Sequence, residues 1–203
     1  MLSRAKKRGR LIIISGPSGS GKSTICRCLL EDGRFKWSVS ATTRKPRPGE
    51  VAGREYHFLS REEFEEGIRR GDFIEYAEVS GNLYGTPRAK LLEDLGKGDV
   101  LIAEVDVQGG MNLMQAFPRA ISIFVEPPGL DISVLEERLR KRGKDDETTI
   151  KERLVLAPRE MEVRSKYKFQ VTNDSVERAV TEIRNIIEQE LREDTKAAEV
   201  LGG

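Results

Sequence analysis

The chain has few of the residues on which several large classes of protein depend. Among its 203 residues are one histidine, one tryptophan and two cysteines, Cys26 and Cys28. No Cys or His cluster completes a metal site. The two cysteines lie two positions apart on one expected helix and so do not face each other. We therefore interpret both as reduced thiols, as in a cytosolic protein.

Long apolar runs and an excess of charge of one sign are also absent. Hydrophobic residues make up 37% and charged residues 34%, and the net charge is +1. This composition favours a soluble protein without a global field that would attract nucleic acid or a membrane. The basic start, MLSRAKKRGR, precedes only four apolar residues, too few for a signal-peptide core or a membrane span. We expect a cytoplasmic protein with flexible ends at 1–9 and 191–203, and the composition leaves a homo-oligomer open.

The clearest positive feature is a glycine-rich segment between a strand and a helix. Gly16–Ser23 reads GPSGSGKS, which matches the phosphate-binding pattern G-x-x-x-x-G-K-[ST]. The apolar run 11–14 predicts a buried parallel strand, and 24–30 has apolar residues at helical spacing. The glycines let backbone N–H groups surround phosphate oxygens, and the helix N-terminus adds positive charge. Lys22 can reach the terminal phosphates and the Ser23 hydroxyl can hold Mg²⁺, so the segment predicts a bound nucleoside triphosphate.

Further strands and helices alternate along the chain. Three apolar segments have the character of the first strand: 100–105, 120–125 and 167–172. Helical patterns lie around 131–142 and 175–192. This alternation predicts an α/β fold with a mostly parallel sheet covered by helices on both faces. Residues 38–90 and 138–164 break the alternation, and we interpret them as lids over the sheet edge, where ligands of open α/β sheets bind.

A basic, hydroxyl-rich loop lies within residues 38–90. Arg44 and Arg47 bracket Lys-Pro, and the proline limits the backbone, so two guanidinium groups can be held in a fixed relation. Paired arginine forks suit phosphate oxygens, although composition alone favours a solvated loop for any single arginine. Neutral hydroxyl groups nearby belong to Ser40, Thr42, Thr43 and Tyr56. The only histidine, His57, falls on a short strand expected at 55–59, and we interpret it as solvent-facing rather than catalytic.

A possible base-reading group follows on a strand expected at 73–79. Glu75 lies on this strand, and Tyr84 and Thr86 follow shortly after it. A carboxylate can accept two N–H bonds from a guanine edge and would reject adenine, which offers the wrong donor pattern. Taken alone, Glu75 would equally be a surface acid.

Together these motifs resemble those of guanylate kinases. The P-loop, S-x-S-x-T-T-R-x-x-R-x-G-E, G-x-x-Y-x-F, F-I-E-Y, G-x-x-Y-G-T and E-V-D-x-Q-G follow the family's order over roughly residues 10–190. The resemblance implies a P-loop core formed by 10–37, 91–130 and 166–190. It also implies a small mixed α/β GMP-binding subdomain at 38–90 and a helical lid at 131–165. The implied reaction is ATP + GMP to ADP + GDP with Mg²⁺, with dGMP as a further acceptor.

The resemblance also implies roles for individual residues. Those implied to bind GMP are Ser40, Arg44, Arg47, Tyr56, Glu75, Tyr84, Thr86, Glu104 and Asp106. Those implied to bind ATP are Gly16, Pro17, Ser18, Gly19, Ser20, Gly21, Lys22, Ser23, Thr24, Arg138, Asn173 and Asp174. Catalysis is implied to rest on Lys22, Arg47, Arg142 and Arg153, with Ser23 at the metal.

Two positions depart from the family's pattern. Many relatives have Asp where this chain has Glu104, so the partner of the longer side chain stays open. Pro158 falls where the return helix of the lid should continue, and we expect it to kink or end that helix.

Two other functions fit parts of the pattern. A non-catalytic guanylate-kinase-like interaction module typically lacks the P-loop lysine or the lid arginines. This chain retains Lys22, Ser23, Arg142 and Arg153. A kinase for another acceptor, such as a ribose phosphate, is disfavoured by Glu75 with Thr86, because these groups fit a purine edge.

Overall fold

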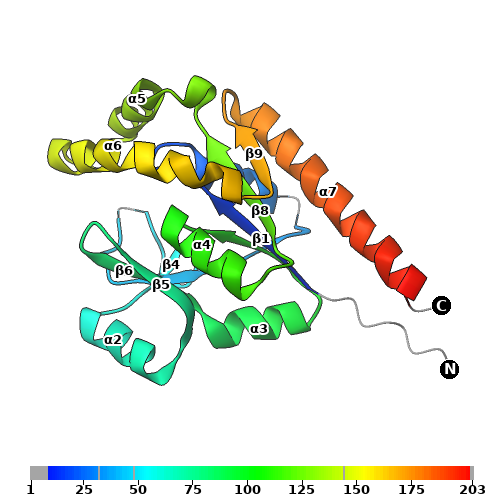
Figure 1. Cartoon of the computed structure of the whole chain (residues 1–203). Helices are drawn as coiled ribbons and strands as arrows, with labels where there is room; N and C mark the ends of the chain where they lie inside the picture. The colour runs from blue at the N-terminus through cyan, green and yellow to red at the C-terminus, as the bar shows by residue number, and fades with distance from the viewer. Residues whose placement is uncertain (1–8, 32, 48, 144, 202–203) are drawn as a thin grey trace.

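A five-stranded sheet runs through the centre of the fold (Figure 1). Its strands in spatial order are β2 (Lys36–Trp37), β7 (Val100–Glu104), β1 (Arg10–Ser15), β8 (Ile121–Glu126) and β9 (Phe169–Thr172). All neighbouring pairs are parallel, as the alternation of strands and helices predicted. The computed structural model describes residues 9–31, 33–47, 49–143 and 145–201. The predicted α/β class is confirmed.

Helices cover both faces of this sheet. One face is covered by α1 (Lys22–Leu30) and α7 (Val176–Leu201), and the other by α3 (Arg88–Gly96) and α4 (Val107–Ala116). Side chains alternate between the faces of a strand, so β1 supplies both cores. Its Ile12 and Ile14 pack with α1 and α7, whereas Leu11 and Ile13 pack with α3 and α4. This packing fixes the loop that follows β1, where the P-loop lies.

The last helix is longer than predicted. We expected a helix over 175–192 and a flexible end, but α7 continues to Leu201. Asp194 pairs with Arg10 at 2.6 Å and with Arg119 at 3.2 Å, which attaches the added turns to the central sheet. The predicted flexible residues 1–8 and 202–203 lie outside the described residues. No helix in the described part of the chain has the length and apolarity needed to cross a membrane.

A second, four-stranded sheet is formed within 38–90. Its spatial order is β4 (Tyr56–Phe58), β3 (Ser40–Thr42), β6 (Asn82–Pro87) and β5 (Phe73–Val79). The β3–β4 pair is parallel and the other pairs are antiparallel, so the sheet is mixed. Strands β4 and β5 agree with the predicted strands at 55–59 and 73–79, and His57 is exposed on β4 as predicted.

This second sheet has its own small core. Helix α2 (Arg61–Arg70) begins with a capping box between Ser60 and Glu63 and ends at Gly71 in the left-handed conformation. Its Phe64 is fully buried and stacks on Phe73 with ring centroids 4.3 Å apart. The same cluster contains Ala41 of β3 and Leu83 of β6.

Two helices joined by a short turn lie over one end of the central sheet (Figure 1). They are α5 (Ile132–Arg142) and α6 (Glu147–Glu162), flanked by single 3-10 turns at Pro128–Leu130 and Val163–Lys166. Asp131 caps α5 and Asp146 caps α6 through side-chain bonds to backbone N–H groups.

Pro158 does not end α6. The helix continues beyond it to Glu162, so of the two predicted effects, a kink or an end, the end was wrong and the kink stays a prediction. The buried side chains of Ile150, Ala157 and Met161 lie along the packed side of α6 on both sides of the proline. Their packing offsets the hydrogen bond that the proline removes.

The Phe64–Phe73 pair generates a test of the second sheet's core. Replacing Phe64 by Ala should lower the free energy of unfolding by about 3–5 kcal/mol, because it leaves a cavity beneath a stacked ring. Phe64→Leu retains most of the buried carbon and should cost clearly less. Urea unfolding would measure both. A loss below about 1 kcal/mol for the alanine variant would show that this pair does not hold the subdomain together.

Candidate functional site

A cavity of about 590 Å³ lies beyond the carboxyl ends of the central strands. Gly16 follows β1, Glu104 ends β7 and Asn173 follows β9, and all three line it. The second sheet and the two lid helices supply the remaining walls. All the sequence-predicted site residues line the cavity except Pro17, Ser20 and Thr86, which support it from behind. The cavity thus lies at the sheet edge where ligands of open α/β sheets bind.

The P-loop glycines are required by its backbone. Gly16 and Gly21 have φ of 142° and 95°, values that side-chain-bearing residues rarely adopt. A Cβ at Gly16 would overlap the carbonyl of Val125, and one at Gly21 would overlap the side-chain amide of Asn173. The loop can therefore approach β8 and the end of β9 only with glycine at these positions.

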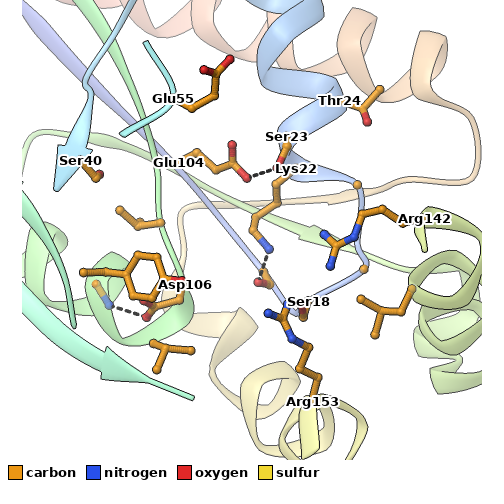
Figure 2. Close-up of a pocket in the computed structure, with 18 of the residues that line it drawn as sticks. Ser18, Lys22, Ser23, Thr24, Ser40, Glu55, Glu104, Asp106, Arg142 and Arg153 are labelled. Atoms are coloured by element: carbon orange, nitrogen blue, oxygen red, sulfur yellow. Dashed lines mark hydrogen bonds between the residues drawn. The ribbon is translucent and has the colours of Figure 1, made fainter. Parts of the chain in front are cut away.

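The P-loop lysine is held by its own loop. The Lys22 Nζ donates to the carbonyl oxygen of Gly16 at 2.6 Å and to that of Pro17 at 2.9 Å. Burial lowers the pKa of Lys22, whereas the charge of Glu104 acts in the opposite direction. The amine is thus fixed at the cavity wall beside the start of α1 (Figure 2).

Glu104 and Asp106 have different partners. The Ser23 hydroxyl donates to Glu104 Oε1 at 2.5 Å, so Glu104 lies against the P-loop (Figure 2). Asp106 instead caps α4, accepting from the N–H of Gly109 at 2.9 Å. Burial raises the pKa of Glu104, and its bond from Ser23 opposes this rise. In this structure, Glu104 rather than Asp106 is therefore the acid beside Ser23.

The arginine loop is organised by Glu50. The Arg44 guanidinium donates to both Glu50 oxygens at 3.0 Å and lies 5.4 Å from the ring centroid of Tyr56. Glu50 also accepts the backbone N–H of Arg47 at 2.7 Å. Tyr84 packs edge-on against Tyr56 at 5.9 Å. The two arginines are therefore presented in a fixed relation, by a carboxylate as well as by the intervening proline.

The hydroxyl groups near this loop divide into two kinds. Ser40 is buried and lines the cavity. Thr42 and Thr43 instead accept backbone N–H groups, from Arg44 at 3.1 Å and from Leu83 at 2.9 Å. Neither threonine lines the cavity, so we interpret both as supporting the loop.

Glu75 is a buried carboxylate with one oxygen facing a small residue. Thr86 Oγ1 donates to Glu75 Oε1 at 2.6 Å, and the side chains of both are almost fully buried. The second oxygen lies beside Gly109, where an added Cβ would come within 3.1 Å. Burial raises the pKa of Glu75 to about 7, although the bond from Thr86 opposes the rise. Glu75 therefore gains or loses its charge near neutral pH.

The lid arginines reach the P-loop in two ways. Arg153 donates to the Ser18 hydroxyl at 2.5 Å, and Arg142 points into the same region from the end of α5 (Figure 2). Arg138 donates to the carbonyl oxygens of Asn173 at 2.7 Å and Ser20 at 3.4 Å. Arg138 thus joins the lid to the backbone around the P-loop.

Asn173 and Asp174 lie together but have different surroundings. The Asn173 amide is buried and donates to the Ser20 carbonyl oxygen at 2.7 Å. Asp174 pairs with Arg178 at 2.9 Å on the first turns of α7. Asn173 is therefore a structural link to the P-loop, whereas Asp174 marks the rim of the cavity.

Sequence reasoning assigned no role to Glu50, Glu55 and Glu160, which line the cavity, or to Asp145, which contacts its arginines. Glu50 is the last residue of the motif S-x-S-x-T-T-R-x-x-R-x-G-E, and its short spacing from Arg44 and Arg47 could have identified it as their partner. Asp145 contacts Arg47, Arg142 and Arg153. Glu160 lines the cavity, and one of its oxygens is buried without a hydrogen-bond partner among the described residues. Asp145 faces Arg142 three positions away but also Arg47, which is 98 positions away, and no motif joins these two arginines.

Comparison with known proteins agrees with this geometry. The guanylate kinase family model matches residues 8–190. Guanylate kinases from Clostridium tetani and Rubrobacter xylanophilus are 46% and 47% identical, over 91% and 89% of this chain and 88% and 94% of theirs. The crystal structure of guanylate kinase from Anaplasma phagocytophilum matches with a TM-score of 0.75 at 34% identity, covering 93% of this chain and 89% of that one. The resemblance drawn from the sequence motifs is confirmed, and the chain belongs to the guanylate kinase family.

Proposed function

We propose that this chain transfers the γ-phosphoryl group of ATP to GMP or dGMP, with Mg²⁺, to give ADP and GDP or dGDP. The observation that carries the proposal is the joint lining of one cavity by Lys22 of the P-loop, the Arg44–Arg47 loop and Glu75. These supply a donor-phosphate site, an acceptor-phosphate site and a reader of the purine edge. Segment 38–90 would bind GMP, and 131–165 would close over ATP. The reaction belongs to purine nucleotide metabolism in the cytoplasm.

The donor triphosphate is assigned to the P-loop. Its backbone N–H groups and the ammonium of Lys22 are suited to phosphate oxygens. Ser23 and Glu104 place two hard oxygen donors side by side, a set that fits Mg²⁺, which keeps water and phosphate ligands and needs few from the protein. When bound, this ion supplies positive charge to the phosphate oxygens.

The acceptor is assigned to the second sheet. Arg44 and Arg47 are suited to the phosphate of GMP, assisted by Ser40, Tyr56 and Tyr84. The ionised carboxylate of Glu75 would accept two N–H bonds from guanine. Adenine lacks that donor pair, so it would leave the buried Glu75 carboxylate unpaired.

Transfer then consists of positioning two anions in line. A phosphate oxygen of GMP forms a bond to the γ-phosphorus, and the bond from that phosphorus to the bridging oxygen of ADP breaks. Arg142 and Arg153 are assigned to the charge on the transferred group. No general base is required, because the acceptor phosphate attacks as an anion. The residues of the chain contribute orientation, charge neutralisation and exclusion of water.

An interaction module without activity is the main alternative from another class. It is disfavoured because Lys22 and Ser23 are placed with Glu104 in a formed P-loop, and because Arg153 contacts that loop. The curated relatives also bear the name of the enzyme.

A substrate panel tests the function as a whole. In a coupled assay with ATP and Mg²⁺, we expect turnover of GMP and dGMP and at least a hundredfold lower kcat/KM for AMP and UMP. Activity with none of the four would favour the interaction module. Preference for UMP or AMP would contradict the role of Glu75.

The acceptor role of Arg47 gives a second test. Replacing Arg47 by Ala should lower GMP turnover by about a thousandfold, because a charge-neutralising arginine is lost, while ATP binding is mostly unchanged. Lys45→Ala is the matched control, since Lys45 is exposed in the same loop. Equal turnover by the Arg47 variant and wild type would overturn the assignment.

The ionisation of Glu75 gives a third test. Its pKa is raised to about 7, so at pH 6 most molecules hold a proton that guanine binding must displace. GMP affinity should therefore increase about tenfold between pH 6 and pH 8 beyond the contribution of the GMP phosphate itself. Titration calorimetry of GMP binding to wild type and to Glu75→Gln separates the Glu75 contribution from that of the GMP phosphate. The phosphate titrates with either protein, whereas Glu75 titrates only in wild type. Parallel pH profiles for the two proteins would show that Glu75 does not titrate in this range.

A further inference from the structure

A single carboxylate lies where the two lid helices meet. Asp145 occupies the turn between α5 and α6, and its side chain is only 4% exposed. Its Oδ1 accepts from Arg47 at 2.8 Å and lies 3.6 Å from Arg153, and its Oδ2 accepts from Arg142. In the proposed mechanism, all three arginines bind or neutralise phosphate groups.

These arginines come from separate parts of the molecule. Arg47 lies in the segment proposed to bind GMP, 98 residues before Asp145 in the sequence. Arg142 is the last residue of α5, and Arg153 lies on α6 and also donates to Ser18 of the P-loop. The Asp145 carboxylate therefore links the Arg44–Arg47 loop to the lid helices. Arg153 extends this link to the P-loop.

The Asp145 carboxylate lies close to the ends of both lid helices. Gly143 ends α5 in the left-handed conformation, and its N–H bonds to the carbonyl oxygen of Arg140. Asp146 follows Asp145 directly and caps α6 by accepting from the N–H of Thr149 at 2.8 Å. Asp145 therefore lies immediately before the N-terminus of α6, and its carboxylate contacts Arg142, the last residue of α5.

The charges show why a carboxylate is needed at this point. Burial lowers the pKa of Arg153, and the charges of Arg142 and Arg47 lower it further, whereas Asp145 opposes them. Burial alone would raise the pKa of Asp145, but the charges of Arg153 and Arg142 bring it below its ordinary value. Three guanidinium groups and one carboxylate leave a net positive charge, which suits a multiply charged phosphoryl group.

We propose that Asp145 is a positioning residue for phosphoryl transfer, which holds Arg47, Arg142 and Arg153 close enough together to act on one transferred group. The inference rests on the proposed function and extends it. Asp145 does not contact the reacting atoms. It acts through the three arginines, so its loss should affect the transition state more than the binding of either nucleotide.

The test compares two neighbouring aspartates by steady-state kinetics with ATP and GMP. Asp145→Asn should lower kcat by about tenfold to a hundredfold and change either KM by no more than about threefold. Asp146→Asn is the matched control, because asparagine also caps helices and Asp146 is exposed. It should retain kcat within about twofold of wild type. Asp145→Glu retains the charge but displaces it, and should lose a smaller part of kcat.

A double-mutant cycle separates positioning from a purely structural role. If Asp145 acts through Arg47, Asp145→Asn should reduce kcat much less in an Arg47→Ala background than in wild type. Unchanged or increased kcat in Asp145→Asn would overturn the proposal, since it would show that Asp145 only occupies the arginines when no phosphate is bound. A lower melting temperature with unchanged kcat would also overturn it. A wild-type chain that phosphorylates no GMP would instead refute the proposed function, and the inference with it.

Discussion

The site depends on holding several cations close together inside a partly closed cavity. Two like charges about 4 Å apart repel each other by roughly 4 kcal/mol at an effective dielectric constant near 20. Arg47, Arg142 and Arg153 all lie within reach of one carboxylate, and the half-buried Lys22 lies in the adjoining P-loop. Such a cluster is stable only where counter-charges and hydrogen-bond acceptors are built in. Much of the polar structure around the cavity serves this requirement.

The chain meets this requirement with carboxylates and backbone carbonyl oxygens placed beside the different cations. Glu50 lies in the same loop as Arg44, and each of its two oxygens accepts from Arg44 Nη2. Lys22 is held by carbonyl oxygens of the P-loop, with Glu104 close by. Asp145 serves arginines from two different segments. Local pairs like Arg44–Glu50 keep one loop in shape, whereas the contacts of Asp145 connect that loop to the two lid helices.

Features encoded within a few residues could be predicted from the sequence. The strand, glycine-rich turn and helix around Gly16–Ser23 form one short unit, and the structure has them as β1, the P-loop and α1. The capping box of α2 at Ser60 and Glu63 is equally local. At Pro158 local propensity allowed a helix end, but α6 continues because its buried side chains pack on both sides of the proline.

The unpredicted features arise from contacts between distant residues. Ser23 and Glu104 are 81 positions apart, and Arg47 and Asp145 are 98 apart. No periodicity or motif spacing reports such a pair, because the pairing is produced by the order of strands in the sheet and the placement of the lid. The motif E-V-D could therefore locate Glu104 and Asp106 but could not say which of them meets the P-loop.

Two carboxylates at the site have pKa values that burial raises, but their charged neighbours differ. Glu75 accepts from Thr86 at 2.6 Å and Glu104 accepts from Ser23 at 2.5 Å, so each has one hydroxyl donor. Glu104 also lies near Lys22, which favours its charged form, whereas Glu75 is near the like charge of Asp106. The charge on Glu75 is thus poorly stabilised until a ligand brings N–H donors to it. A base that supplies two such donors would stabilise the charge on Glu75 and bind more tightly as a result. A base without them would leave that charge poorly stabilised. In the proposed function, the selectivity for guanine would therefore come from the incomplete stabilisation of Glu75 in the free protein.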